Sequence, residues 1–228
     1  MPVRLQSGAI PKMSQTINVL LDLDGTLTDS RPGIVRAIAY ALDRLGREPV
    51  DEAELARHIG LSLFDWFGAL LSTDEVAVIR NAVDIYREYY GTRGMYESEV
   101  YDGIPAALVS LTGRGARLFI ATSKPRSSAC RIAEHFGFDR HLAGVWGSEL
   151  DGRLTDKRDL IAHIMKAENL AAANTIMVGD RHHDVRGALD NGIACAGVLW
   201  GYGCRDELAS AGCSRFLSAP AELAAVIA

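Results

Sequence analysis

The sequence predicts an α/β protein: a parallel sheet covered by crossover helices, with a small all-helical module inserted just after the first strand. Two observations predict this architecture. Short apolar runs alternate with helical segments over most of the chain, and one long stretch has helical patterns with almost no strand signal. The composition agrees, because 228 residues with 48% hydrophobic and 23% charged residues are typical of a globular protein with a buried core, and it excludes a disordered chain, a collagen and a coiled coil.

Four short apolar runs are the predicted strands. They are rich in Val, Ile and Leu, and such runs fit strands that are buried on both faces, as in a parallel sheet. They cover residues 17–21, 117–121, 175–178 and 193–199.

Three helical segments lie between or beside these runs, and their alternation with strands indicates crossover connections. They cover residues 125–136, 158–170 and 184–191. Gly137 and Gly192 follow the first and the third segment, and glycine commonly ends a helix.

The stretch from about Gly33 to Gly94 is the predicted helical insert. Two sets of apolar residues in it have the spacing of helices that pack against each other, so we expect their tyrosines to be core rather than ligand contacts. The sets are Ile34, Val35, Ile38, Leu42 and Leu45, and Val76, Ile79, Val83, Tyr86 and Tyr90.

The predicted division is a core of residues 15–32 and 99–228, a helical domain of residues 33–98, and a leader or tag of residues 1–14. The leader lacks the apolar segment of a signal peptide, so we expect it to be disordered and place the native start at Met13.

Net charge and cysteine content indicate which binding partners and which cellular compartment to expect. With 24 basic and 29 acidic residues the net charge is −5, which gives no positive field for nucleic acid. The 4 cysteines form no close C-x-x-C pair, which is typical of reduced thiols in a cytoplasmic protein. No apolar run approaches the roughly 18 to 20 residues of a membrane span. We therefore expect a cytoplasmic protein without nucleic-acid or membrane partners.

Asp22 and Asp24 follow the first strand directly, at the end where open α/β sheets bind ligands. Gly25 indicates that the backbone turns there, so the two carboxylates can take different roles, one as nucleophile and the other as general acid and base. The alternative, that both only cap the following loop, is less favoured because carboxylates beside a buried strand need a partner ion or a function.

A second acidic pair, Asp180 and Asp184, follows the strand at 175–178. If the helix has begun by Asp180, the spacing puts both on one face, where together with Asp22 they could supply oxygen ligands for Mg²⁺. The structural alternative is an N-cap Asp180 with a first-turn Asp184. The adjacent His182 and His183 are interpreted as structural or rim residues.

Thr122 and Ser123, at the end of the strand at 117–121, offer hydroxyls and backbone N–H groups at a helix start, which suits an anion such as phosphate, although both residue types are also common caps. Lys157 opens the following helical segment and could neutralise a phosphoryl group. Taken alone, this lysine would be a solvated surface charge.

Together, Asp22-x-Asp24-Gly25-Thr26, Thr122-Ser123, Lys157 and Gly179-Asp180-x-x-x-Asp184 resemble the four ordered motifs of the haloacid dehalogenase-like hydrolase superfamily. The resemblance spans nearly the whole chain. It implies a Rossmann-like, doubly wound parallel sheet with a small inserted helical cap of the first subclass. Residues 24–34 and 197–203 are similar to its phosphoglycolate-phosphatase-like branch.

The resemblance implies a role for each motif residue. Asp22 would attack phosphorus, and Asp24 would protonate the leaving oxygen and then activate water. Asp22, the backbone carbonyl of Asp24, and Asp180 would hold Mg²⁺. The remaining residues would bind phosphate (Thr122, Ser123, Lys157) or support these groups (Asp184, Thr26). Since Lys157 lacks the Lys-Pro-x-Pro context of many relatives, Lys124 is the alternative lysine.

The function implied is a Mg²⁺-dependent phosphatase for a small phosphomonoester, with phosphoglycolate and 5′-mononucleotides as the first candidate substrates. The alternatives are a phosphomutase of the β-phosphoglucomutase type and a phospho-receiver module, which also carries a phosphorylatable aspartate. In the predicted cap, Phe64 or Trp66 could contact substrate or pack in the core.

Overall fold

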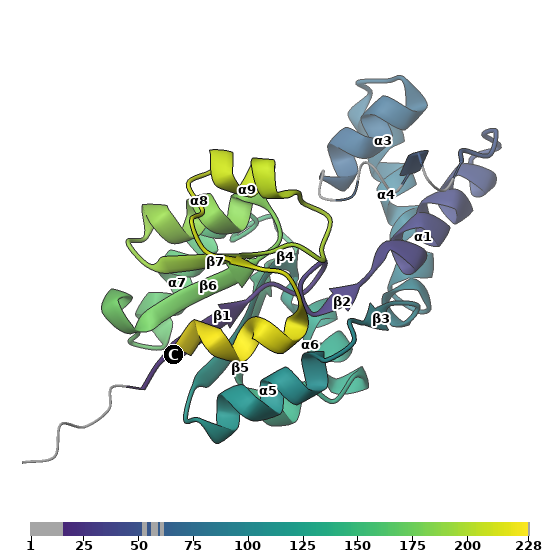
Figure 1. Cartoon of the computed structure of the whole chain (residues 1–228). Coiled ribbons are helices and arrows are strands. Elements are labelled where there is room, and N and C mark those ends of the chain that lie inside the picture. The colour runs from purple at the N-terminus through teal and green to yellow at the C-terminus, as the bar shows by residue number, and fades with distance from the viewer. Residues whose placement is uncertain (1–15, 52–53, 56–58, 60–61, 228) are drawn as a thin grey trace, which may run out of the picture.

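The computed structural model describes residues 16–227 apart from 52–53, 56–58 and 60–61. Its centre is a six-stranded parallel sheet in the order β5-β4-β1-β6-β7-β8 (Figure 1). The strands are β1 (Asn18–Leu21), β4 (Arg117–Pro125), β5 (Leu142–Ser148), β6 (Thr175–Gly179), β7 (Ala194–Val198) and β8 (Phe216–Leu217).

All four predicted strands are confirmed, as β1, β4, β6 and β7, and two further strands lie at the sheet edges. An edge strand is paired on one side only and needs fewer apolar residues. β5 contains Gly144 and Gly147 and is largely half-buried, and β8 has 2 residues. Neither therefore forms the continuous apolar run that indicates a central strand.

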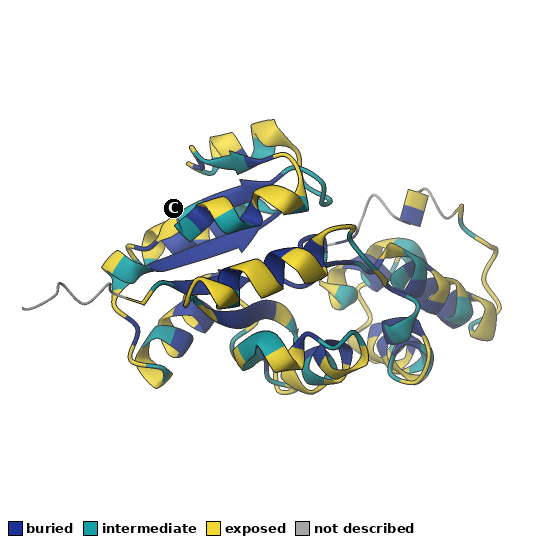
Figure 2. Cartoon of the chain, turned by 60° about the horizontal axis from the view of Figure 1, so that its bottom comes forward, coloured by how far each residue is buried: buried dark blue, intermediate teal, exposed yellow. Residues whose placement is uncertain are grey.

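Helices cover both faces of the sheet, which is the doubly wound arrangement. Alternate residues of each strand point to opposite faces: Val19 and Leu21 belong to one apolar cluster and Leu20 to another. The first cluster includes residues of α5 (Ile104–Gly113) and α6 (Arg126–His135), and the second includes residues of α7 (Lys157–Ala167) and α8 (His182–Asp190). In Figure 2 the central strands are buried and the outer faces of the helices are exposed. The remaining elements on the core are α9 (Arg205–Ser210) and the 3₁₀ turns η2 (Asp139–His141), η3 (Ala172–Asn174) and η4 (Pro220–Ile227), whereas the 3₁₀ turn η1 (Gly94–Tyr96) packs on the helix at Arg31–Arg44.

Within the described residues, three helices form a separate group beside the sheet, which we call the helical lobe: α1 (Arg31–Arg44), α3 (Leu63–Leu71) and α4 (Val76–Tyr90) (Figure 1). Both α1 and α3 pack on α4. Most residues of the predicted apolar faces are buried there, Ile34 and Leu45 are partly buried, and Val76 is exposed. Val76, which is 48% exposed, is the first residue of α4.

The chain leaves the core and returns to it along a short antiparallel pair, β2 (Thr28–Asp29) and β3 (Glu99–Val100), with Asp29 opposite Glu99. Just beyond this pair, the outgoing and the returning segments of the chain contact each other at Gly33 and Gly94. A Cβ atom on Gly33 would lie 1.8 Å from the carbonyl oxygen of Gly94, so only glycine permits this approach.

The predicted leader, residues 1–14, lies outside the described residues. Among the helices of the part that is described, none combines the length and the apolar character needed to cross a membrane.

Candidate active site

The carboxyl ends of three neighbouring strands bring the predicted motifs together. β1 lies between β4 and β6 and is parallel to both, so Asp22, Thr122 and Asp180 lie at one edge of the sheet. A cleft of about 1870 Å³ opens there and extends to the helical lobe. Asp22, Asp24, Thr122, Ser123, Lys124, Lys157 and Asp184 all line it.

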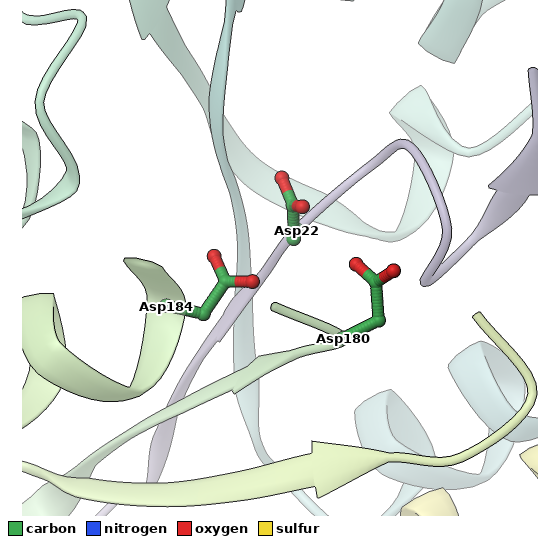
Figure 3. A group of neighbouring side chains, drawn as sticks. All are labelled: Asp22, Asp180 and Asp184. Atoms are coloured by element: carbon green, nitrogen blue, oxygen red, sulfur yellow. The ribbon is translucent and has the colours of Figure 1, made fainter. Parts of the chain in front are cut away.

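Asp22, Asp180 and Asp184 form the acidic group of the site, and all three are buried. Each offers a carboxylate oxygen, and these oxygens lie within 4.8 Å of one another around one small space (Figure 3). Burial raises the pKa of Asp22 to about 7, against the opposing effect of Lys157. Burial, and then the charges of Asp22 and Asp184, raise the pKa of Asp180 to about 8. Three carboxylates this close need positive charge nearby.

Lys157 supplies part of that charge. Its Nζ lies 2.8 Å from Asp22 Oδ1 and 2.6 Å from Asp184 Oδ1, and it donates to the carbonyl oxygen of Ala121 at 2.7 Å. Burial opposes the charged form, but Asp184 and Asp22 raise the pKa of Lys157, so it stays protonated. The surface-charge interpretation is wrong, because Lys157 is 6% exposed. One ammonium does not balance three ionised carboxylates, so full ionisation of this group requires a further positive charge.

The oxygens of this group fit a divalent cation. Asp180 Oδ2 accepts a hydrogen bond from the backbone N–H of Tyr202 at 2.7 Å, whereas Oδ1 is buried and accepts none from any residue that the structure describes. A buried carboxylate oxygen without a donor is costly unless a cation binds it. Hard oxygen ligands of this kind suit Mg²⁺, which keeps open positions for water and phosphate.

One sequence expectation, that Asp180 and Asp184 share a helical face, requires a helix that has begun by Asp180, but the helix starts later. α8 begins at His182, so Asp180 lies before the helix and the two aspartates do not share a helical face. The N-cap is Arg181 rather than Asp180, which corrects the structural alternative as well. Asp184 lies in the first turn and accepts a hydrogen bond from the backbone N–H of Arg181 at 3.1 Å. That bond turns the chain so that both carboxylates still face Asp22.

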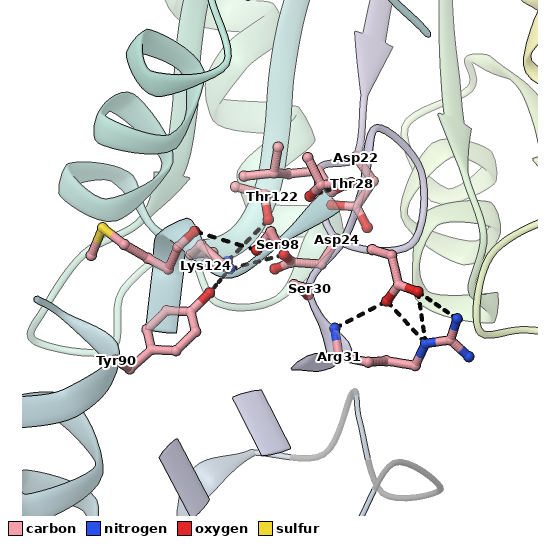
Figure 4. A network of polar contacts seen from close by, with 12 residues as sticks. Asp22, Asp24, Thr28, Ser30, Arg31, Tyr90, Ser98, Thr122 and Lys124 are labelled. Carbon is pink, nitrogen blue, oxygen red and sulfur yellow. Dashed lines mark hydrogen bonds and ion pairs between the residues drawn. The ribbon is translucent and has the colours of Figure 1, made fainter. Parts of the chain in front are cut away.

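Asp24 is held apart from the acidic group by a different lysine. Lys124 Nζ lies 2.8 Å from Asp24 Oδ1 and also contacts the hydroxyl of Tyr90, at the end of α4 (Figure 4). The two candidate lysines therefore contact different aspartates, Lys157 with Asp22 and Lys124 with Asp24. Tyr90 was expected only in the core, and its apolar spacing gives no signal for this polar contact.

The predicted hydroxyl residues are placed differently from one another. Thr122 is buried within β4, and its Oγ1 accepts a hydrogen bond from the backbone N–H of Lys124 at 3.2 Å. Ser123 is exposed and donates to the carbonyl oxygen of Thr155 at 2.9 Å. Thr26 is fully buried, and its hydroxyl has no hydrogen-bond partner in the described part of the chain.

Tyr202 is a site residue that the sequence analysis missed. Its backbone N–H binds Asp180, and its side-chain oxygen accepts a hydrogen bond from the backbone N–H of Ser30 at 2.7 Å. The flanking glycines permit this, because a Cβ on Gly201 would lie 2.4 Å from the Cβ of Asp180 and one on Gly203 would lie 2.0 Å from its carbonyl oxygen. The Gly-Tyr-Gly sequence was the available signal.

Glu207 on α9 fixes the start of α8. Its Oε1 accepts hydrogen bonds from Arg181 Nε at 2.9 Å and from the backbone N–H of His182 at 3.0 Å. Although partial burial acts in the opposite direction, these bonds from His182 and Arg181 lower the pKa of Glu207 to about 2. Arg181 also reaches the helical lobe, where its Nη1 donates to the carbonyl oxygen of Ile59 at 2.9 Å. His182 is thus structural, and His183 is exposed at the cleft rim.

The lobe side of the cleft contains one exposed aromatic ring. Both Phe64 and Trp66 line the cleft, but Phe64 is 39% exposed, whereas Trp66 is 2% exposed and packs within the lobe. Arg80 and Arg87 of α4 lie on the same wall. Of the two aromatic residues considered for substrate contact, Phe64 is therefore the more accessible from the cleft.

A family model described as haloacid dehalogenase-like hydrolase matches residues 19–198, a range that contains all four motifs. The chain belongs to this hydrolase family. The chain is also 50% identical over 191 residues to a 5′-nucleotidase of Pseudomonas aeruginosa, which covers 84% of this chain and 86% of that protein. A phosphoglycolate phosphatase of Cupriavidus necator is 31% identical over 188 residues, with 81% of each chain covered.

Two further relatives show the range of functions assigned to similar chains. The tyrosine-protein kinase PtkA of Mycobacterium tuberculosis is 41% identical over 189 residues, which are 82% of this chain and 64% of that protein. Among solved structures, a predicted phosphatase from Clostridium acetobutylicum superposes with a TM-score of 0.85 at 39% identity, covering 93% of this chain and 98% of that one. The fold and the family are therefore shared across most of the chain.

Proposed function

We propose that the protein is a Mg²⁺-dependent phosphatase that hydrolyses a small phosphomonoester through an aspartyl phosphate on Asp22. The observation that carries this proposal is the position of Asp22, whose carboxylate lies 2.8 Å from the ammonium of Lys157 and beside the unsatisfied oxygen of Asp180. A phosphate that approaches Asp22 there meets a fixed positive charge. The phosphatases and the 5′-nucleotidase among the relatives support the same reaction class.

The proposed Mg²⁺ ligands are the carboxylates of Asp22 and Asp180 and the backbone carbonyl of Asp24. Asp184 supports this group through its ion pair with Lys157 at 2.6 Å. When bound, Mg²⁺ supplies positive charge that lets an anionic nucleophile and an anionic phosphate approach each other.

In the first step, a carboxylate oxygen of Asp22 attacks phosphorus while the bond from phosphorus to the leaving oxygen breaks. Asp24 gives its proton to that oxygen, and the released alcohol departs. Lys157 holds Asp22 in place and balances charge on the phosphoryl oxygens, which Thr122 and Ser123 bind as further donors. Ser123 must exchange its bond to Thr155 for this role.

In the second step, Asp24 takes a proton from a water molecule that attacks the same phosphorus. The bond from phosphorus to Asp22 breaks, and inorganic phosphate leaves. Asp24 is again protonated and Asp22 is again a free carboxylate, so the cycle closes. Positioning and charge neutralisation supply most of the rate enhancement in such a transfer.

The proposed domains are the core of residues 15–32 and 99–228 and a cap of residues 33–98, which contains the helical lobe apart from the first two residues of α1. Among small phosphomonoesters, we favour nucleoside 5′-monophosphates because the most similar of the relatives above is a 5′-nucleotidase and because the cleft of about 1870 Å³ extends well past Asp22 to Phe64. Phosphoglycolate is the second candidate, supported by the Cupriavidus enzyme. The free cysteines favour a cytoplasmic location.

The test is release of inorganic phosphate from mononucleotides, phosphoglycolate and sugar phosphates, with Mg²⁺ and then with EDTA. We expect release from one class of substrate, loss of release with EDTA, and none from Asp22→Asn. Conversion of a sugar phosphate to its isomer without free phosphate would instead identify a phosphomutase. A phosphorylated protein that persists for hours would identify a receiver module.

A further inference from the structure

Tyr90, Lys124 and Asp24 form a polar chain that joins the helical lobe to the catalytic edge of the sheet. Tyr90 ends α4, Lys124 belongs to β4, and Asp24 follows β1. Lys124 Nζ lies 2.8 Å from Asp24 Oδ1 and contacts the hydroxyl of Tyr90, and it lies 4.9 Å from the centroid of the Tyr90 ring (Figure 4). The lysine therefore lies between the aspartate and the lobe.

Lys124 and Tyr90 are largely buried and the Asp24 side chain is 22% exposed, so these contacts differ from a surface ion pair. The Lys124 side chain is 7% exposed and Tyr90 is 8% exposed. Surface pairs contribute little because water screens them and both side chains stay mobile, whereas a buried ammonium is costly without its partners. Burial raises the pKa of Tyr90 well above its usual range, so the hydroxyl stays protonated and its oxygen accepts a hydrogen bond from the ammonium.

A second contact fixes the end of α4 that carries Tyr90. The carbonyl oxygen of Gly91, the next residue, accepts a hydrogen bond from Arg131 Nη1 of α6 at 2.9 Å. The Tyr90 ring also stacks on Tyr86, with centroids 5.3 Å apart and an angle of 11° between the planes. The hydroxyl of Tyr90 is thus held at one place over the core.

We infer that Tyr90 and Lys124 are positioning residues for Asp24, and that the lobe takes part in the proton transfer through them. The inference rests on the role proposed above for Asp24. The ammonium binds Oδ1, so the proton that Asp24 transfers is carried on Oδ2. Tyr90 and Lys124 themselves transfer no proton. Because Tyr90 belongs to the lobe and contacts Lys124, the lobe helps to hold Lys124, and through it Asp24, in this orientation.

The test compares two substrates that differ in their need for an acid. The leaving oxygen of glycerol 2-phosphate must be protonated, whereas p-nitrophenolate leaves without a proton. For Tyr90→Phe we expect kcat/KM for glycerol 2-phosphate to fall about 10-fold and that for p-nitrophenyl phosphate to change by less than about 2-fold. The matched control is Tyr89→Phe on the same helix, whose hydroxyl binds Glu97 at 2.9 Å and should change neither value.

Equal losses with both substrates, or no loss with either, would overturn the inference. Lys124→Met tests the other link, and we expect a selective loss of about 100-fold with glycerol 2-phosphate. If Lys124→Met instead raises KM equally for both substrates, this lysine binds the substrate phosphate and positions nothing. Asp22→Asn separates the two proposals. If Asp22→Asn still releases phosphate, the proposed function is wrong. If Tyr90→Phe has the same ratio of kcat/KM for the two substrates as the wild type, only this inference is wrong.

Discussion

Lys157 and Asp22 lie 135 residues apart in the sequence, yet Lys157 Nζ and Asp22 Oδ1 are 2.8 Å apart in the buried part of the cleft. This contact crosses from the start of α7 to the end of β1. It places the positive charge that the proposed reaction needs next to the atom that attacks phosphorus.

Lys157→Met should therefore lower kcat/KM for phosphate release by about 100-fold or more, because it removes charge stabilisation in the transition state. It should also destabilise the metal-free protein by about 3 kcal/mol, since it leaves the carboxylates of Asp22 and Asp184 uncompensated. Phosphate release and chemical denaturation measure the two effects. Lys166→Met, an exposed lysine of the same helix, is the control and should change neither. Full activity in Lys157→Met would favour Lys124 as the phosphate lysine.

Asp22→Asn should abolish turnover, because an amide oxygen does not form the aspartyl phosphate. It should leave the fold intact, because the new side-chain amide keeps an oxygen for Lys157 and the substitution removes one of the crowded buried charges. Phosphate release and thermal unfolding, measured on the same preparation, check both statements. A folded Asp22→Asn protein with wild-type turnover would exclude Asp22 as the nucleophile.

The metal-free protein should lose stability as the pH rises from about 6 to about 8. The pKa values of Asp22 and Asp180 are raised from the ordinary value of 3.8 to about 7 and about 8, so the folded state binds more protons than the unfolded state between these limits. Stability therefore falls with pH across that window. Thermal unfolding in EDTA measures the fall, which Mg²⁺ should reverse. In Asp180→Asn the fall should be smaller and Mg²⁺ should stabilise less; a rise in stability from pH 6 to pH 8 in EDTA would contradict the prediction.

Gly25→Ala should weaken Mg²⁺ binding and lower activity, and a control variant with the same backbone strain should not. Gly25 has a φ of +83°, and a Cβ atom there would lie 2.3 Å from Asp180 Oδ2. Gly115→Ala is the matched control, because Gly115 has a φ of +85° and nothing lies within 4 Å of its added Cβ. Both variants should lose about 1 to 2 kcal/mol of stability from the left-handed backbone. Only Gly25→Ala should need more Mg²⁺ for activity, and equal Mg²⁺ titrations would refute the steric argument.

The sequence was sufficient for the central strands and for the residues at their ends. Strands buried on both faces leave an unbroken apolar run, and a carboxylate that ends such a run stands out, as Asp22 and Asp180 do. The edge strand β5 leaves no such run. The start of α8 could not be located either, because Arg181 and Asp184 set it through a hydrogen bond at 3.1 Å that spacing alone does not specify.

Tyr90 illustrates a second limit. Its spacing with Val83 and Tyr86 predicts burial, and it is buried. Its hydroxyl nevertheless meets Lys124, a contact between elements that are distant in the sequence. A pattern of apolar residues describes one helix at a time and does not report which polar atom lies opposite the helix end. Tertiary structure was needed to connect the lobe with Asp24.

The antiparallel pairing of Asp29 with Glu99 has a consequence for how such a protein can diversify. The chain leaves the core and returns to it at adjacent positions. The pairing of the central strands therefore does not depend on the length or the sequence of the segment between them. Such a segment can be exchanged, enlarged or redesigned while the sheet keeps its geometry, provided that the new segment again supplies a partner for Lys124. The close approach of Gly33 and Gly94 marks the boundary that an exchanged segment must respect.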